Sequence, residues 1–138
     1  MSKKKVLVPV DGSDRSLVSL EYVKDNFKPE DVEVTIMHVR EIVFVNGMAV
    51  SEEVRDGEML GKRVLEEAKK KLPGFNVKTE FTFGSPGDEI VNYTQEDKTD
   101  IIVMGKNTNK KFSFLVGSVT AYVVKRVKCI VIMIPEEF

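Results

Sequence analysis

Cysteine and histidine are scarce in this sequence, and their scarcity excludes two ways of organising a small protein. The 138 residues include one cysteine and one histidine. A single cysteine cannot form an internal disulfide, and no ligand spacing typical of a zinc site is present. We therefore exclude a disulfide-stabilised secreted scaffold and a zinc-organised domain, and a reducing, cytoplasmic location is the simplest expectation.

Long apolar runs and an excess of one charge are also missing. The apolar run at residues 130–135 is far shorter than the roughly 20 residues of a membrane-spanning helix. Near the N-terminus, Pro9 and Asp11 cut short the apolar stretch that an export signal would need. Because 21 basic and 22 acidic side chains leave a formal net charge of −1, no global field attracts nucleic acid or a membrane. We expect neither as a partner.

The composition that remains is that of an ordinary globular protein. Hydrophobic residues make up 42% of the chain and charged residues 31%, which is close to the averages for soluble domains and excludes intrinsic disorder. The length is typical of one hydrophobic core. We therefore expect residues 1–138 to form a single domain.

Five segments have the pattern of β-strands. Residues 6–10 and 32–39 are largely apolar, which is typical of strands covered on both faces. Residues 77–83 alternate between apolar and polar side chains, as an edge or half-exposed strand does. Residues 100–104 and 129–134 are the remaining two strands.

Helix signals separate these strands. Ser13 is a good N-cap directly after the first strand. A second helix is indicated by apolar residues at successive i+4 positions, namely Leu60, Val64, Ala68 and Leu72. Both signals predict helices that pack one apolar face on a sheet.

Two more helix starts follow. Ser85 predicts an N-cap, with Pro86 at the first helical position and Asp88 completing a capping-box-like pair. Ser118 opens the last helix. By contrast, residues 40–51 show neither helical nor strand periodicity, so we expect a long loop or lid there.

Alternating strands and helices predict a parallel sheet with helices on both faces, that is, a three-layer α/β/α domain. Ligands bind such sheets beyond the carboxyl ends of the strands, where the strand order reverses. Asp11 follows the first strand, where its carboxylate could accept hydrogen bonds from a ribose hydroxyl or an exocyclic amine. It is about equally well explained as a residue that only shapes the turn and supports Ser13 as a cap.

A second candidate site lies between Gly105 and Thr120. Glycine lets a backbone approach a ligand closely, and the helix start at Gly117 and Ser118 offers N–H groups and a dipole that favour an anion. Ser118 and Thr120 add hydroxyl donors. The segment from Lys106 to Lys128 contains six basic residues and no acidic one. Phosphate is the natural partner, although these residues taken alone are better explained as an ordinary cap after a solvated lysine loop.

Catalytic machinery is not evident. Neither the P-loop pattern nor a G-x-G-x-x-G turn is present. His38 lies within a buried strand and is interpreted as a core residue, and Cys129 has no neighbour that would activate a thiolate. A phosphorelay receiver would need an aspartate at the end of the third strand, where residues 81–85 contain none.

Taken together, the motifs resemble those of the universal stress protein family. Five segments match that family in the right order, and together they span the chain: residues 8–13, 37–39, 84–86, 103–120 and 129–132. The resemblance implies five parallel strands in the order 3-2-1-4-5, a homodimer formed through the last strand at residues 129–134, and an adenine-nucleotide site. The residues implied to bind the nucleotide are Pro9, Asp11, Val39, Met104, Gly105, Thr108, Gly117, Ser118, Val119 and Thr120.

Two departures from the family pattern divide the expectations. Thr108 stands where nucleotide-binding members have a middle glycine, and eight rather than nine residues separate it from Gly117. Lys110 or Lys111 could supply compensating charge to the phosphates. The first hypothesis is a stress-response sensor that binds ATP, AMP or ADP, with Mg²⁺ left open and at most slow ATP hydrolysis. The alternative is an interaction module of the same family with an empty site.

Overall fold

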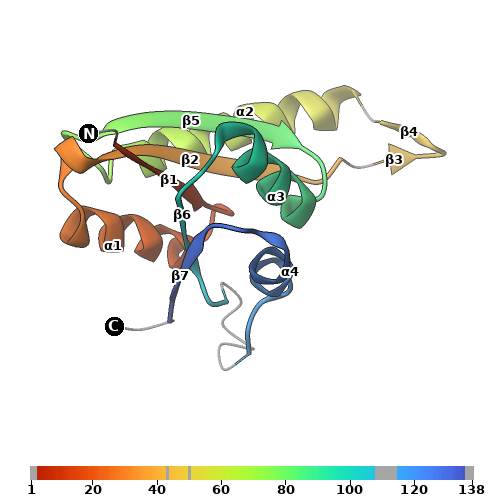
Figure 1. Cartoon of the computed structure of the whole chain (residues 1–138). Coiled ribbons are helices and arrows are strands. Elements are labelled where there is room, and N and C mark those ends of the chain that lie inside the picture. Colours follow the sequence, from red (N-terminus) through yellow and green to blue (C-terminus); the bar gives the residue numbers. More distant parts are fainter. Residues whose placement is uncertain (1–2, 43, 50, 108–114, 136–138) are drawn as a thin grey trace.

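The computed structural model describes residues 3–42, 44–49, 51–107 and 115–135, and a parallel sheet is its central element (Figure 1). The strands of this sheet are β1 (Lys4–Pro9), β2 (Val32–Arg40), β5 (Asn76–Phe83), β6 (Ile101–Gly105) and β7 (Ile130–Ile134). They lie in the order β5-β2-β1-β6-β7, and every neighbouring pair is parallel. Counted along these five strands the order is 3-2-1-4-5, so the expected fold is confirmed.

The position of each strand follows from its side chains. In β1, Val6, Leu7 and Val8 are all buried, because both faces of this central strand are covered. In β5, exposed and half-buried residues alternate over the first half of the strand, as predicted for an edge. The strand β7 forms the opposite edge.

Four helices cover the sheet: α1 (Val18–Asn26), α2 (Ser51–Lys69), α3 (Pro86–Asp97) and α4 (Ser118–Arg126). Side chains of α1 and α2, such as Leu20 and Leu65, share a buried cluster with Val6 and Val8. Side chains of α3 and α4, such as Ile90 and Val123, pack in a second cluster on the other face. The result is the three-layer arrangement predicted from the sequence.

The segment predicted to be a loop or lid contains a β-hairpin. The strand β3 (Phe44–Val45) pairs with β4 (Met48–Ala49) around a turn in which Asn46 and Gly47 both have positive φ. This is the backbone that an Asn-Gly hairpin turn requires. Strands of two residues are too short to show a period of two, so sequence periodicity missed them. The hairpin projects away from the sheet (Figure 1).

One residue of the apolar stripe predicted for the second helix is exposed. Leu60 is 44% exposed, whereas Leu65 and Ala68 are buried. The helix instead turns Gly57 and Gly61 toward the aromatic rings of Phe83 and Phe81 in β5. Because these glycines have no side chain, a pattern of apolar residues could not show which face packs on the sheet.

The strand register brings the segments that follow β1, β2 and β6 to the same end of the sheet. Pro9 at the end of β1 pairs with Met37 in β2, and β6 lies on the other side of β1. The chain leaves β1 toward β2 and returns to the far side of β1 with β6, so the strand order reverses there. In the part of the chain that the structure describes, no helix is long and apolar enough to cross a membrane.

Candidate functional site

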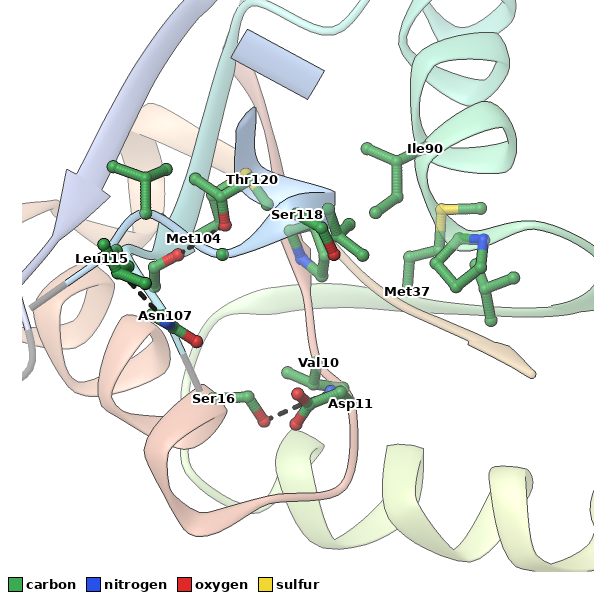
Figure 2. Close-up of a pocket in the computed structure, with 17 residues that line it drawn as sticks. Val10, Asp11, Ser16, Met37, Ile90, Met104, Asn107, Leu115, Ser118 and Thr120 are labelled. Atoms are coloured by element: carbon green, nitrogen blue, oxygen red, sulfur yellow. Dashed lines mark hydrogen bonds between the residues drawn. The ribbon is translucent and has the colours of Figure 1, made fainter. Parts of the chain in front are cut away.

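A cavity of about 440 Å³ lies beyond the carboxyl ends of β1, β2 and β6, beside the starts of α3 and α4 (Figure 2). Nine of the ten sequence-predicted residues line it: Pro9, Asp11, Val39, Met104, Gly105, Gly117, Ser118, Val119 and Thr120. The tenth, Thr108, lies outside the described residues. The two candidate sites of the sequence, at Asp11 and at Gly117, are therefore two sides of one cavity.

The turn after β1 holds the Asp11 carboxylate in place. The Ser13 N–H and hydroxyl donate to Oδ1 of Asp11 at 2.9 and 2.5 Å, and Gly12 between them has a φ of 89°. The Asp11 N–H in turn donates to Oγ of Ser16 at 3.3 Å (Figure 2). Asp11 therefore shapes its own turn and also lines the cavity.

The predicted cap at Ser13 is present. Its Oγ accepts a hydrogen bond of 3.2 Å from the Ser16 N–H at the start of a short 3-10 helix, η1 (Asp14–Leu17). A second 3-10 turn, η2 (Pro29–Asp31), leads into β2. The Ser13 side chain thus provides a hydrogen-bond acceptor for a free N–H group at the start of this first helix.

The start of α4 is different, because no side chain among the described residues caps it. Its N-cap is Gly117, which has no side-chain oxygen to offer. The first N–H groups of an α-helix have no acceptor within the helix, and they carry the positive end of its dipole. Since Ser118, Val119 and Thr120 line the cavity, these N–H groups lie where an anion could accept from them.

Backbone and side-chain hydrogen bonds fix α4 relative to β6. The Gly117 N–H donates to the Lys106 carbonyl at 2.8 Å, and the Thr120 hydroxyl donates to the Gly105 carbonyl at 2.8 Å. Asn107 Nδ2 donates to the Leu115 carbonyl at 3.1 Å. The proton of the Thr120 hydroxyl is therefore used within the protein, which corrects the expectation that Thr120 donates to a ligand.

The start of α3 also lacks the cap that the sequence predicted. Ser85 is the N-cap, but its side chain makes no capping hydrogen bond. Asp88 does not reach back to complete a capping box, because its carboxylate accepts from the hydroxyl of Tyr122 in α4. The bond joins the first turn of α3 to the middle of α4, two elements that both border the cavity.

Part of the cavity lining is apolar and buried, and we call it the apolar wall. Val10, Met37, Ile90 and Met104 make up this part, and each is at most 5% exposed. Figure 2 shows Met37 and Ile90 on one side of the cavity and Asn107 and Leu115 on the other, with Ser118 between them. A largely apolar lining with a few polar groups is typical of small-molecule sites.

Sequence reasoning missed eight of the lining residues: Val10, Ser16, Met37, Pro86, Ile90, Asn107, Leu115 and Val116. Some had a usable signal. Met37 lies two positions before Val39 in β2 and therefore shares its face, and Pro86 follows the predicted cap. Ile90 lies one helical turn after Pro86 in α3, and the packing of α3 on the sheet brings it to this cavity.

The described cavity has few ionisable side chains. Asp11 is the one charged side chain among the described lining residues, and the described chain contains no group of three or more metal-ligating side chains. Cys129 lies outside the cavity, and burial raises the pKa of its thiol above the ordinary value. His38 is buried, as predicted, and does not line the cavity.

Comparison with known proteins gives a consistent result. The sequence model of the universal stress protein family matches residues 3–135. A universal stress protein of Methanocaldococcus jannaschii is 33% identical over 140 residues, covering 96% of this chain and 82% of that protein. The match extends over nearly the whole chain.

Solved structures share the fold. A second M. jannaschii protein, whose structure was a test case of structural genomics, has a TM-score of 0.68 at 28% identity, with 97% of this chain and 96% of that chain covered. A universal stress protein in complex with cAMP has a TM-score of 0.71 at 22% identity, with 99% of this chain and 100% of that chain covered.

Proposed function

Because the chain belongs to the universal stress protein family, we propose that its cavity binds an adenine nucleotide and that the protein acts as a sensor in a stress response. The observation that carries the proposal is the uncapped start of α4, which borders the same cavity as the apolar wall and Asp11. A nucleotide consists of a flat aromatic ring, a polar sugar and an anionic phosphate. In this proposal these three parts lie against the apolar wall, Asp11 and the start of α4, respectively.

The adenine ring lies against the apolar wall in this proposal. Met37, Ile90 and Met104 supply apolar surface, and Pro9 and Val39 border the same region. A flat ring buries much surface there without leaving a charge unpaired. In this proposal the Val39 backbone forms hydrogen bonds to the exocyclic amine or ring nitrogens of adenine.

The ribose and the phosphates extend toward α4. The Asp11 carboxylate accepts from the ribose hydroxyls, and the N–H groups of Ser118, Val119 and Thr120 donate to phosphate oxygens. Gly105 and Gly117 let the backbone come close to these groups. Thr108 belongs to the same phosphate-binding loop in this proposal.

The ligand is ATP, ADP, AMP or a close relative such as the cAMP bound by the structural neighbour. Any Mg²⁺ that accompanies ATP would be held by the phosphates, because Asp11 is the one carboxylate among the described lining residues. With no base placed beside the phosphate end among those residues, regulated binding fits the site better than fast hydrolysis.

We also propose that two copies pair through β7. This strand lies at an edge of the sheet, where backbone groups can bond to another strand. Ile130 is 63% exposed and Met133 is 42% exposed on it. Burying these side chains against a second copy would remove apolar surface from water.

Isothermal titration with ATP, AMP and cAMP tests the nucleotide proposal. Saturable heat with one site per chain is the expected result, and the ranking of the three ligands identifies how many phosphates the site prefers. Absence of heat at millimolar nucleotide, with protein shown to be folded by circular dichroism, would overturn the proposal in favour of an interaction module with an empty site.

A further inference from the structure

His38 is buried in β2, and its side chain makes one hydrogen bond to Val10, the residue between the end of β1 and Asp11. It is 3% exposed, and its Nδ1 lies 2.8 Å from the carbonyl oxygen of Val10. A carbonyl oxygen can only accept, so Nδ1 carries the proton and the imidazole is the donor. The sole histidine of the chain therefore joins β2 to the end of β1.

This bond lies at the rim of the cavity. Val10 immediately precedes Asp11, and the Val10 N–H donates to the Met37 carbonyl at 2.8 Å. Val10 is thus held on both its N–H and its carbonyl by consecutive residues of β2, Met37 and His38. Both Val10 and Met37 line the cavity, so the two bonds set how the two strand ends face one another.

Packing alone does not account for a histidine at this position. The ring packs near Phe81, with 6.0 Å between ring centroids, and its Nε2 is buried without a hydrogen-bond partner among the described residues. A buried nitrogen that makes no bond is unfavourable. A leucine of similar size would fill the space without that cost, but it could not donate to Val10.

We infer that His38 is a positioning residue for the nucleotide site: its Nδ1–H holds the Val10 carbonyl and thereby fixes the turn that presents Asp11. The inference rests on the proposed function for its effect on ligand affinity. Its structural part, the order of the turn at residues 10–13, does not depend on a ligand.

Three substitutions separate the hydrogen bond from the packing. His38→Asn places an amide nitrogen where Nδ1 was, His38→Gln places one where Nε2 was, and His38→Leu keeps the volume without a donor. We expect His38→Leu and His38→Gln to bind AMP about tenfold more weakly than the native protein, as loss of one hydrogen bond predicts, while His38→Asn stays within about threefold. Equal affinity of the Leu and Asn variants would overturn the inference.

Hydrogen exchange in ligand-free protein distinguishes this inference from the proposed function. The amides of Asp11 and Ser13 should exchange about tenfold faster in His38→Leu than in His38→Asn, while amides of α3 remain unchanged. If the native protein binds no nucleotide but this difference appears, the proposed function fails and the positioning role stands. If exchange at residues 10–13 is the same in both variants, the positioning role fails.

A measurement on the native protein covers the case in which a variant does not fold. Nitrogen-15 NMR of the imidazole reports which ring nitrogen carries the proton. The expected result is the tautomer protonated at Nδ1, and a ring protonated at Nε2 alone would overturn the inference.

Discussion

The hydroxyl of Thr120 donates a hydrogen bond of 2.8 Å to the carbonyl of Gly105, which ties the first turn of α4 to the last residue of β6. Thr120 is 5% exposed, and the bond is partly buried. A helix start binds an anion well when its N–H groups are already held in place, because little ordering remains to be done on binding. The hydrogen bond to the Gly105 carbonyl explains why position 120 needs a threonine and not a purely apolar residue.

Replacing Thr120 by valine keeps the shape of the side chain and removes the donor. We expect the free energy of unfolding to fall by about 1–2 kcal/mol, because the Gly105 carbonyl loses a buried donor. Nucleotide affinity should fall as well, since α4 is no longer tied to β6. Urea denaturation and titration calorimetry measure the two effects. Thr120→Ser retains the hydroxyl and is the matched control, and a valine variant equal to the serine variant would contradict the assignment.

Replacing Asp11 by asparagine removes the charge and keeps an oxygen that can accept from Ser13. We expect adenine-nucleotide affinity to fall at least about tenfold, because hydrogen bonds to a charged acceptor are stronger than those to a neutral one. The free energy of unfolding should change little. Asp14→Asn makes the same change of charge three residues away at an exposed position outside the cavity, and it should leave the affinity unchanged.

Replacing Ile130 by lysine places a charge on the edge strand β7. Lysine on an exposed edge opposes pairing with a second strand, so the variant should be monomeric where the native protein is a dimer. Light scattering after size-exclusion chromatography gives the mass of each. The control is Met48→Lys, because Met48 is 73% exposed on the hairpin β3–β4 and lies far from β7. A native protein that is monomeric would already contradict the proposed dimer.

The bond between Tyr122 and Asp88 predicts a dependence of stability on pH. The Tyr122 hydroxyl donates to the Asp88 carboxylate, and this raises the pKa of Tyr122 above its ordinary value. The contribution is fully present below the unfolded-state pKa of about 10 and is lost as the pH rises through the raised folded-state pKa.

Tyr122→Phe isolates this hydrogen bond. The phenylalanine ring can still pack under the Arg126 guanidinium, which lies 3.5 Å from the ring centroid in the native protein. We expect the native protein to exceed the variant in free energy of unfolding at about pH 8, with the difference shrinking toward about pH 11. A difference that stays constant over this range would show that the hydroxyl bond is not its source.

Local sequence patterns predicted the strands, because the arrangement of apolar residues in a strand indicates which of its faces are buried. The apolar run of β1 indicates a strand covered on both faces, and the alternation at residues 77–83 indicates an edge, which is where β5 lies. Strand order needed more than local pattern, since several orders satisfy the same alternation of helices and strands. It followed from resemblance across the whole chain.

Features that depend on packing between distant elements could not be predicted. Ser85 has the right residue type for a cap, but Asp88 is bonded to Tyr122 instead of closing the box. Likewise Leu60 follows an i+4 spacing that a helix of 3.6 residues per turn carries away from the sheet. The Tyr122 side chain determines the partner of Asp88, and Gly57 and Gly61 determine which face of α2 packs on the sheet. The local sequence pattern predicts neither contact.

The candidate site likewise contains some residues that local sequence predicts and others that only the packing of distant elements brings together. Asp11, Gly105, Gly117 and Ser118 could be predicted, because turn residues and helix starts mark the carboxyl ends of parallel strands. The apolar wall could not be predicted in full, because Ile90 reaches the cavity only through the packing of α3 on the sheet.

Chemical-shift mapping with AMP on nitrogen-15-labelled protein tests the central claim most directly, because it reports both whether a nucleotide binds and where. The predicted result is saturable shifts concentrated at the amides of residues 10–16 and 117–120, with little change at the amino ends of the strands. No shifts at millimolar AMP, or shifts confined to a surface away from Asp11 and α4, would contradict the account.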